Sequence, residues 1–309
     1  MDQILLDTII SRIQAVPSVE AVMLSGSRTA GSLDAHSDTD LYVYWSEAVD
    51  AEVRRELAGE FASAMEIDNR FWEPEDLWIL KDEQASAHEP GAKPEKVELI
   101  YRDYDFLRGE LERIHRRCEA WVGYSTCIAA NWYTSQILFD RNGRFASLRE
   151  EFPDEYPADL VQNIINKNYP ILADSLSSYH VQIETAVARG DVVSVNHRVA
   201  AFLASYFDII FALNRRWHPG EKKLAKIVDT SGLKVPDGFA RSLDKLLFSA
   251  GTADPQLLIF IGLMSNHLGE LIRQEGYSLP RLRSTIGEDA ENADARASEG
   301  ELGHEVEGE

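Results

Sequence analysis

The sequence predicts an α+β fold, in which a small mixed β-sheet with packed helices precedes an all-α helical bundle. Short apolar runs bounded by small and turn-forming residues occupy the first 103 residues, and such runs are typical of strands. Beyond residue 104, apolar residues recur mainly at the three- and four-residue spacing of helices. The 309 residues also suffice for two domains of ordinary size.

The N-terminal third is predicted to contain helices and strands in turn. Gly and Ser in its small-residue stretch suit a tight turn with accessible backbone N–H groups. The expected elements are a helix over 3–15, a strand over 21–24, the small-residue stretch 25–32, a strand over 40–45, a helix over 48–65, a strand at 78–80, a loop over 81–94 and a strand over 97–101.

The rest of the chain is predicted to be almost entirely helical. A helix begins near residue 104, and a short extended piece at 137–140 is followed by a turn at 141–143. Prolines near the expected ends support the boundaries of the later helices, which are 158–168, 171–189, 193–214, 220–229, 238–249 and 254–274. We therefore expect a first domain over residues 1–140, a helical domain over 141–284 and an acidic tail over 285–309.

Composition and charge exclude several classes of protein. Hydrophobic residues make up 44% and charged residues 27% of the chain, and no run of 18 apolar residues occurs, so we expect no membrane partner. The net charge of −21 argues against a nucleic-acid partner, which would require basic surface. The first 16 residues lack the basic start of a secretory signal, and the two cysteines form no metal-binding spacing. We therefore expect a cytoplasmic protein.

The C-terminal tail contributes strongly to the negative charge. From residue 287 onward, nine acidic residues accompany one arginine and almost no large apolar residue. Such a segment cannot bury enough apolar surface to repay the entropy of ordering. We predict that it is disordered and keeps the protein soluble.

Three acidic residues and a small-residue turn form the most informative pattern in the sequence. Gly26 and Ser27 follow a strand, Asp38 and Asp40 open the next strand, and Glu98 lies within a later strand. Alternate residues of a strand point to one face, so Asp38 and Asp40 are expected to project together. Two neighbouring carboxylates repel each other unless a cation lies between them.

A divalent cation with oxygen ligands fits this arrangement. Mg²⁺ prefers oxygen ligands and keeps coordination positions open for substrate phosphates. We expect Asp38, Asp40 and Glu98 to bind Mg²⁺, while Gly26 and Ser27 hold the phosphates of a nucleotide. Glu98 is also a candidate general base for an attacking hydroxyl, and the sequence leaves open whether it binds metal, accepts a proton or does both.

These residues resemble the polymerase-β-type nucleotidyltransferase superfamily. Its members have a hydrophobic-Gly-Ser turn, an Asp-x-Asp pair and a third acidic residue on a later strand. Here these features correspond to Leu24–Ser27, Asp38–Asp40 and Glu98. The resemblance covers about residues 18–103 and implies a small mixed sheet, and transfer of a nucleoside monophosphate, most often AMP from ATP, to an acceptor hydroxyl.

The helical part is similar to a helical domain of unknown function that follows such domains in bacteria. The similarity rests on residues 137–143, 189–191 and 211–222, and it extends to aminoglycoside nucleotidyltransferases. In those enzymes, basic residues of the helical domain help bind the triphosphate. The resemblance therefore implies Arg215 and Lys222 as phosphate contacts. The acidic composition of the chain favours a small cationic acceptor, such as an aminoglycoside-like compound.

Other interpretations remain open at the level of sequence. Arg28 either contacts phosphate or forms a structural ion pair, and cations near the end of a helix, such as Arg215, are favoured by the helix dipole alone. One alternative enzyme would modify a macromolecule, either tRNA or protein, as toxin-like members of the superfamily do. A second alternative is a partner protein that binds nucleotide without catalysis. The acceptor, the preferred base, the number of metals and the oligomeric state are not determined by the sequence.

Overall fold

The computed structural model describes residues 3–25, 39–71, 73–81 and 95–280. The elements within these residues follow the chain in this order: α1 (Gln3–Gln14), β1 (Val19–Ser25), β2 (Thr39–Trp45), α2 (Ala51–Phe61), β3 (Ala62–Asn69), β4 (Glu75–Leu80), β5 (Lys96–Arg102), α3 (Tyr104–His115), α4 (Cys127–Thr134), β6 (Gln136–Asp140), α5 (Arg144–Glu151), α6 (Ala158–Tyr169), a π-helical turn (Pro170–Asp174), α7 (Tyr179–Ala188), α8 (Val192–Leu213), α9 (Leu224–Thr230), α10 (Phe239–Ala250) and α11 (Gln256–Gln274).

The described strands form one mixed six-stranded sheet in the order β3-β4-β5-β2-β1-β6. β2 and β5 are parallel to each other, and the other neighbouring strands are antiparallel. This sheet, followed by a largely helical chain, confirms the predicted α+β class.

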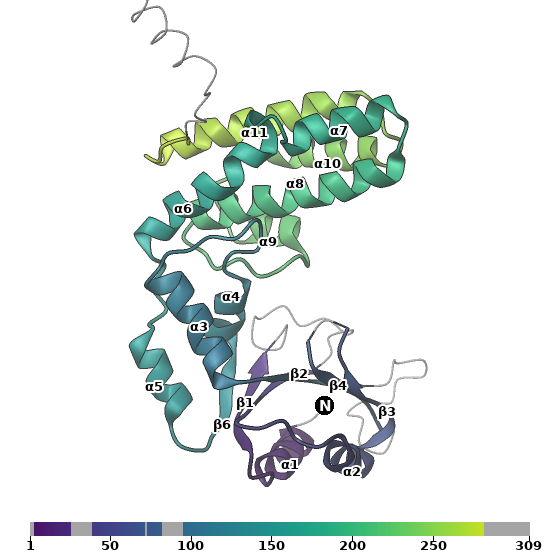
Figure 1. The fold of residues 1–309 in the computed structure, drawn as a ribbon, viewed down its shortest axis with the longest axis vertical. Helices are drawn as coiled ribbons and strands as arrows, with labels where there is room; N and C mark the ends of the chain where they lie inside the picture. Colours follow the sequence, from purple (N-terminus) through teal and green to yellow (C-terminus); the bar gives the residue numbers. More distant parts are fainter. Residues whose placement is uncertain (1–2, 26–38, 72, 82–94, 281–309) are drawn as a thin grey trace, which may run out of the picture. The chain divides into compact units, whose positions relative to one another are not determined.

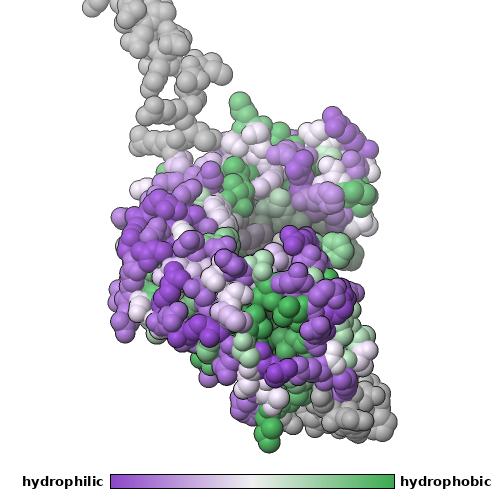
Figure 2. Space-filling model, turned by 60° about the horizontal axis from the view of Figure 1, so that its bottom comes forward, coloured by the Kyte–Doolittle hydropathy of each residue, from purple (hydrophilic) through white to green (hydrophobic). Residues whose placement is uncertain are grey.

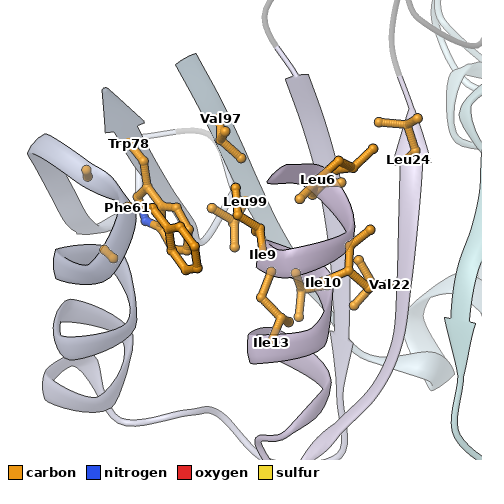
Figure 3. Packing of buried hydrophobic residues seen from close by; sticks show 14 of the residues in the cluster. Leu6, Ile9, Ile10, Ile13, Val22, Leu24, Phe61, Trp78, Val97 and Leu99 are labelled. Carbon is orange, nitrogen blue, oxygen red and sulfur yellow. The ribbon is translucent and has the colours of Figure 1, made fainter. Parts of the chain in front are cut away.

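Helices α1 and α2 cover one face of the sheet (Figure 1). Apolar residues of α1 recur every three or four positions and so form one buried stripe. Figure 3 shows Leu6, Ile9, Ile10 and Ile13 of this stripe close to apolar side chains of the strands. Complete burial of a side chain of this size stabilises the fold by about 1.5–3 kcal/mol.

The opposite face of the sheet packs against residues of α3, α4 and α5. Tyr44, Leu107, Trp132 and Phe145 are buried there in a second cluster. Successive residues of each central strand therefore point to the two faces in turn, because side chains alternate along a strand with a period of two.

The contacts divide the chain into two compact units. The first contains Met1–Ile164 and Ala204–Val235, and the second contains Ile165–Leu203 and Pro236–Glu309. Residues 204–235 thus belong to the same compact unit as the sheet although a long helical segment separates them from it in the sequence. The ranges 1–140 and 141–284 remain a prediction of the sequence, and the tail 285–309 lies outside the described residues.

The second unit is helical in its described part. Tyr169 donates a hydrogen bond to the carbonyl of Ser265 on α11, at 3.3 Å. Gly269 lies one turn further along α11, where an added Cβ would come within 2.4 Å of the Tyr169 hydroxyl. A residue without a side chain is therefore required at this close approach.

Four segments differ from the predicted elements. The predicted helix 48–65 ends at Phe61, and its last residues begin β3, because pairing with β4 outweighs the helical pattern of a short segment. The predicted helix 171–189 is broken, since Pro170 opens a π-helical turn and Ser178 caps the N-terminus of α7. Helices α4 and α5 were not predicted. Both are only eight residues long, which is too short for a clear periodicity.

The exposed surface is mixed in character. Figure 2 shows hydrophilic side chains over much of one face, with hydrophobic side chains gathered between them. Phe71, Leu176 and Phe248 are among the large hydrophobic residues that are at least 80% exposed. No helix in the described part of the chain is both long enough and apolar enough to cross a membrane.

Arg54 of α2 makes a buried ion pair that attaches α2 to the sheet. Its guanidinium binds the carboxylates of Asp76 on β4 and Asp68 on β3. Asp76 is completely buried, and it also accepts a hydrogen bond from the Tyr101 hydroxyl at 2.7 Å. The Arg54 guanidinium lies 4.9 Å from the centre of the Tyr101 ring, so the pair is enclosed by aromatic surface.

We predict that Arg54→Ala lowers the free energy of unfolding by about 3 kcal/mol, because it leaves the Asp76 carboxylate buried without its cation. The neighbouring Arg55 is half-exposed and pairs only with Glu52 among the described ion pairs, so Arg55→Ala should change stability by less than about 0.5 kcal/mol. Urea unfolding followed by circular dichroism measures both values. Equal losses in the two variants would contradict the prediction.

Candidate nucleotide and metal site

Three polar residues lie in one row across the centre of the sheet. Ser25, the last residue of β1, is paired with Asp40 on the antiparallel strand β2. Asp40 is in turn paired with Glu98 on the parallel strand β5. Directly paired residues of neighbouring strands point to the same face, and neighbouring strands are about 4.8 Å apart. We call Ser25, Asp40 and Glu98 the polar row.

The apolar residues on either side determine which face the polar row occupies. Leu41 and Leu99, each next in sequence to an acid of the row, are paired with each other and buried in the α1/α2 core. Asp40 and Glu98 therefore face the opposite side, where both are partly exposed. The arrangement places two carboxylates side by side and within reach of solvent.

The surroundings of the polar row are rich in negative charge. Burial and the nearby carboxylates of Glu98, Glu73 and Glu66 raise the pKa of Glu75 on β4. Burial also raises the pKa of Tyr42 to about 12, with Arg102 opposing the shift and Glu73 and Asp40 adding to it. This region favours a bound cation, because opposite charge relieves repulsion among the carboxylates.

The residues present fit a divalent cation as far as they are described. Asp40 and Glu98 supply two oxygen donors on one face, which is the chemistry that Mg²⁺ prefers. Asp38 would be the third donor, and it lies outside the described residues. Within the part that the structure describes, no three His, Cys, Asp or Glu side chains are grouped closely enough to hold a metal.

The other residues of the predicted phosphate-binding turn also lie outside the described part. Gly26, Ser27 and Arg28 belong to residues 26–38, which connect β1 to β2. The described ends of this connection are Ser25 and Thr39, and Ser25 is paired with Asp40. The connection therefore begins and ends at the polar row.

A chain of hydrogen bonds that the sequence analysis missed holds the first residue of the polar row. The Nδ2 of Asn131 on α4 donates to Ser25 Oγ at 2.6 Å. The Oδ1 of Asn131 accepts from Arg102 Nη1 at 3.4 Å, and Arg102 binds Glu73 through two further bonds of 2.6 and 2.7 Å. The guanidinium of Arg102 also lies 4.3 Å from the centre of the Tyr42 ring. The one sign of this hydrogen-bond network in the sequence was the charged Arg102 at the end of an apolar strand.

Arg215 and Lys222 lie on an exposed loop of the first unit, between α8 and α9, and not on the strands of the polar row. Asn214 fixes the start of the loop by exchanging hydrogen bonds with the backbone of Lys234. His218, in the middle of the loop, is buried against the start of α4, where its backbone N–H donates to Thr126 Oγ1 at 2.8 Å.

The buried His218 is held in its neutral form. Burial lowers the pKa of His218 to about 4. Its Nδ1 accepts a hydrogen bond from the Gly220 N–H at 3.1 Å and lies 3.4 Å from the Cys127 sulfur. Protonation of Nδ1 would place two N–H groups against each other. Cys118 and Cys127 are free thiols.

Two family matches and one structural similarity relate the chain to known proteins. Residues 7–89 match the family described as polymerase beta, nucleotidyltransferase, and residues 121–224 match a domain of unknown function, DUF4037. A nucleotidyltransferase-like protein from Exiguobacterium sibiricum 255-15 is similar in structure. Its TM-score is 0.38 at 13% sequence identity, over 96% of this chain and 87% of that chain. No curated protein matches the sequence.

We predict that the free energy of unfolding falls as the pH is lowered from 6.5 toward 4, because His218 is neutral in the folded protein. The pKa of His218 in the folded protein, about 4, is below its ordinary value of 6.5. The unfolded chain therefore binds more protons between these values. Neutral His218 makes its full contribution to the free energy of unfolding above pH 6.5. This contribution is lost as the pH falls toward 4. Between pH 7 and pH 5 the loss is about 2 kcal/mol.

Denaturant unfolding at several pH values measures this dependence. His218→Gln cannot titrate at this position and should flatten the profile between pH 7 and pH 5. His197 is exposed on α8, so His197→Gln serves as the matched control and should retain the wild-type slope. An unchanged slope in His218→Gln would show that other groups cause the pH dependence.

Proposed function

From the premise that the chain carries a polymerase-β-type nucleotidyltransferase domain followed by a DUF4037 domain, we propose that it is a Mg²⁺-dependent nucleotidyltransferase. It moves a nucleoside monophosphate, AMP from ATP, to a hydroxyl of a small acceptor. The observation that carries this proposal is the pairing of Asp40 with Glu98 on adjacent parallel strands. Glu98 lies beyond the residues matched by the nucleotidyltransferase family, so the sheet itself supplies this partner.

In the proposed reaction, Asp38, Asp40 and Glu98 hold the metal beside the triphosphate. A bound divalent cation supplies charge neutralisation for the phosphates and for the leaving pyrophosphate. The acceptor oxygen attacks the α-phosphorus, and the bond between the α-phosphorus and the bridging oxygen breaks to release pyrophosphate. Glu98 is within the polar row and can also accept the proton of the acceptor hydroxyl.

The triphosphate needs positive groups and N–H donors in this acidic region. We propose that the backbone and hydroxyl of Gly26 and Ser27 bind its phosphates, with Arg28 nearby, as small-residue turns do in other proteins. We further propose that Arg215 and Lys222 contact the phosphates. Their loop belongs to the same compact unit as the polar row and is anchored to α4, which supports this assignment.

The charge of the protein suggests the class of acceptor. The chain has a net charge of −21, and the carboxylates of Glu98, Glu73 and Glu66 all interact with that of Glu75. Negative potential concentrates cations near a site. We therefore propose a small cationic acceptor with a free hydroxyl, such as an aminoglycoside-like compound.

We expect Asp40→Asn and Glu98→Gln each to reduce acceptor-dependent pyrophosphate release roughly a hundredfold or more, because each removes a charge from the reacting centre. Asp38→Asn should behave in the same way. Purified protein is incubated with ATP, Mg²⁺ and a panel of hydroxyl-bearing cationic compounds, and pyrophosphate is measured. Glu56 is exposed on α2, so the isosteric change Glu56→Gln is the control and should retain wild-type activity.

The same assay separates the proposal from its rivals. Transfer of label from ATP to a protein or RNA of a cell lysate, without release on any small acceptor, would favour a macromolecular substrate. Binding of ATP that persists in Asp38→Ala and Asp40→Ala, without any transfer, would favour a non-catalytic nucleotide-binding protein. Failure of all four nucleoside triphosphates to release pyrophosphate with any acceptor would refute transfer to a small molecule.

A second prediction concerns the loop between α8 and α9. Arg215→Ala and Lys222→Ala should each raise KM for the triphosphate about fivefold, which corresponds to roughly 1 kcal/mol for an exposed charge contact. The effect should decrease as salt concentration rises. Lys226 is exposed nearby, on α9, and Lys226→Ala is the control. Equal effects of all three variants would indicate a general effect of charge and not specific contacts.

A further inference from the structure

We propose that Asn131 is a positioning residue for triphosphate binding, which holds Ser25 of the polar row in place at the end of β1. This inference rests on the proposed function, because it assigns a role in triphosphate binding. Asn131 lies on α4, outside the residues matched by the nucleotidyltransferase family. It nevertheless bonds to the last residue of β1, directly before Gly26.

The bond between Asn131 and Ser25 has a defined direction. The Oδ1 of Asn131 faces the guanidinium of Arg102, which can only donate. The amide Nδ2 is therefore directed at Ser25 Oγ, which accepts at 2.6 Å. Arg102 is 9% exposed and is itself fixed by Glu73, so the amide has little freedom to rotate.

Ser25 transmits this constraint to the polar row. It is 2% exposed and is paired with Asp40 across β1 and β2. A hydroxyl that accepts from Asn131 retains its own proton, so Ser25 Oγ can still donate a bond of its own. The end of β1 is therefore held both by the hydrogen bond from Asn131 on α4 and by its pairing with β2.

Helix α4 is a rigid support for this contact. Trp132, adjacent to Asn131, is 1% exposed in the second core cluster. At the other end of α4, Thr126 and Cys127 contact His218 of the loop that carries Arg215 and Lys222. One short helix thus contacts both Ser25 and the loop that carries Arg215 and Lys222.

Binding of ATP with Mg²⁺ to the full-length protein tests the role of Asn131. Dissociation constants are measured by calorimetry for the wild type, Asn131→Ala, Ser25→Ala and the double variant, together with melting temperatures. We expect each single variant to bind about fivefold more weakly, as for loss of one neutral hydrogen bond. The double variant should bind no more weakly than the weaker single variant, because both changes remove the same contact.

The control is Thr134→Ala on the same helix. Its exposed hydroxyl donates to the backbone carbonyls of Ala130, at 2.7 Å, and of Asn131, at 3.4 Å, and not to β1. This variant should bind ATP like the wild type. If Asn131→Ala fails to fold, Ser25→Ala still tests the contact from the side of the strand, and unchanged affinity in it overturns the proposal.

Two other results would also overturn the positioning role. Lower melting temperatures with unchanged affinity would assign Asn131 a purely structural role, and additive losses in the double variant would show that it does not act through Ser25. If the wild type itself binds no ATP with Mg²⁺, the proposed function and the positioning role fail together. Binding by the wild type with unchanged binding by Asn131→Ala refutes only the positioning role.

Discussion

The parallel pairing of β2 with β5 is the constraint on which the candidate site depends. It places Asp40 beside Glu98, although the whole of α2, β3 and β4 separates them in the sequence. Leu41 and Leu99 fix this register by their burial under α1 and α2. A slip of one residue would turn a carboxylate into that core, where an unpaired charge is very costly. The apolar residues of the two strands therefore determine the position of the two acids.

The short helix α4 joins parts of the first unit that are far apart in the sequence. Asn131 reaches Ser25 on β1, while Thr126 receives the backbone N–H of His218. Residues 204–235 consequently belong to the same compact unit as the sheet. The match to DUF4037 spans both α4 and this loop, so the helical domain contributes directly to the unit that contains the polar row.

The charge distribution imposes opposite requirements on the proposed substrates. Carboxylates around Glu98 favour a cationic acceptor, and the same carboxylates repel a triphosphate. A divalent cation bound by the acids would reconcile these requirements, and the basic residues of the loop between α8 and α9 would add to its effect in the proposed reaction. The buried pair of Arg54 and Asp76 lies elsewhere, in contact with Tyr101, and serves to attach α2 to the sheet.

The sequence by itself determined the α+β class and the apolar stripe of α1, because alternation and helical spacing are local properties of the chain. It also predicted the acidic residues of the candidate site. It overextended the helix that ends at Phe61 and missed α4, since short segments carry no clear period and strand pairing decided the outcome. Only the tertiary structure decided that Glu98 is the neighbour of Asp40, and that Asn131, Arg102 and Ser25 meet. Contacts between residues distant in the chain arise from the order of strands and the packing of helices, and neither leaves a periodic signal in the sequence.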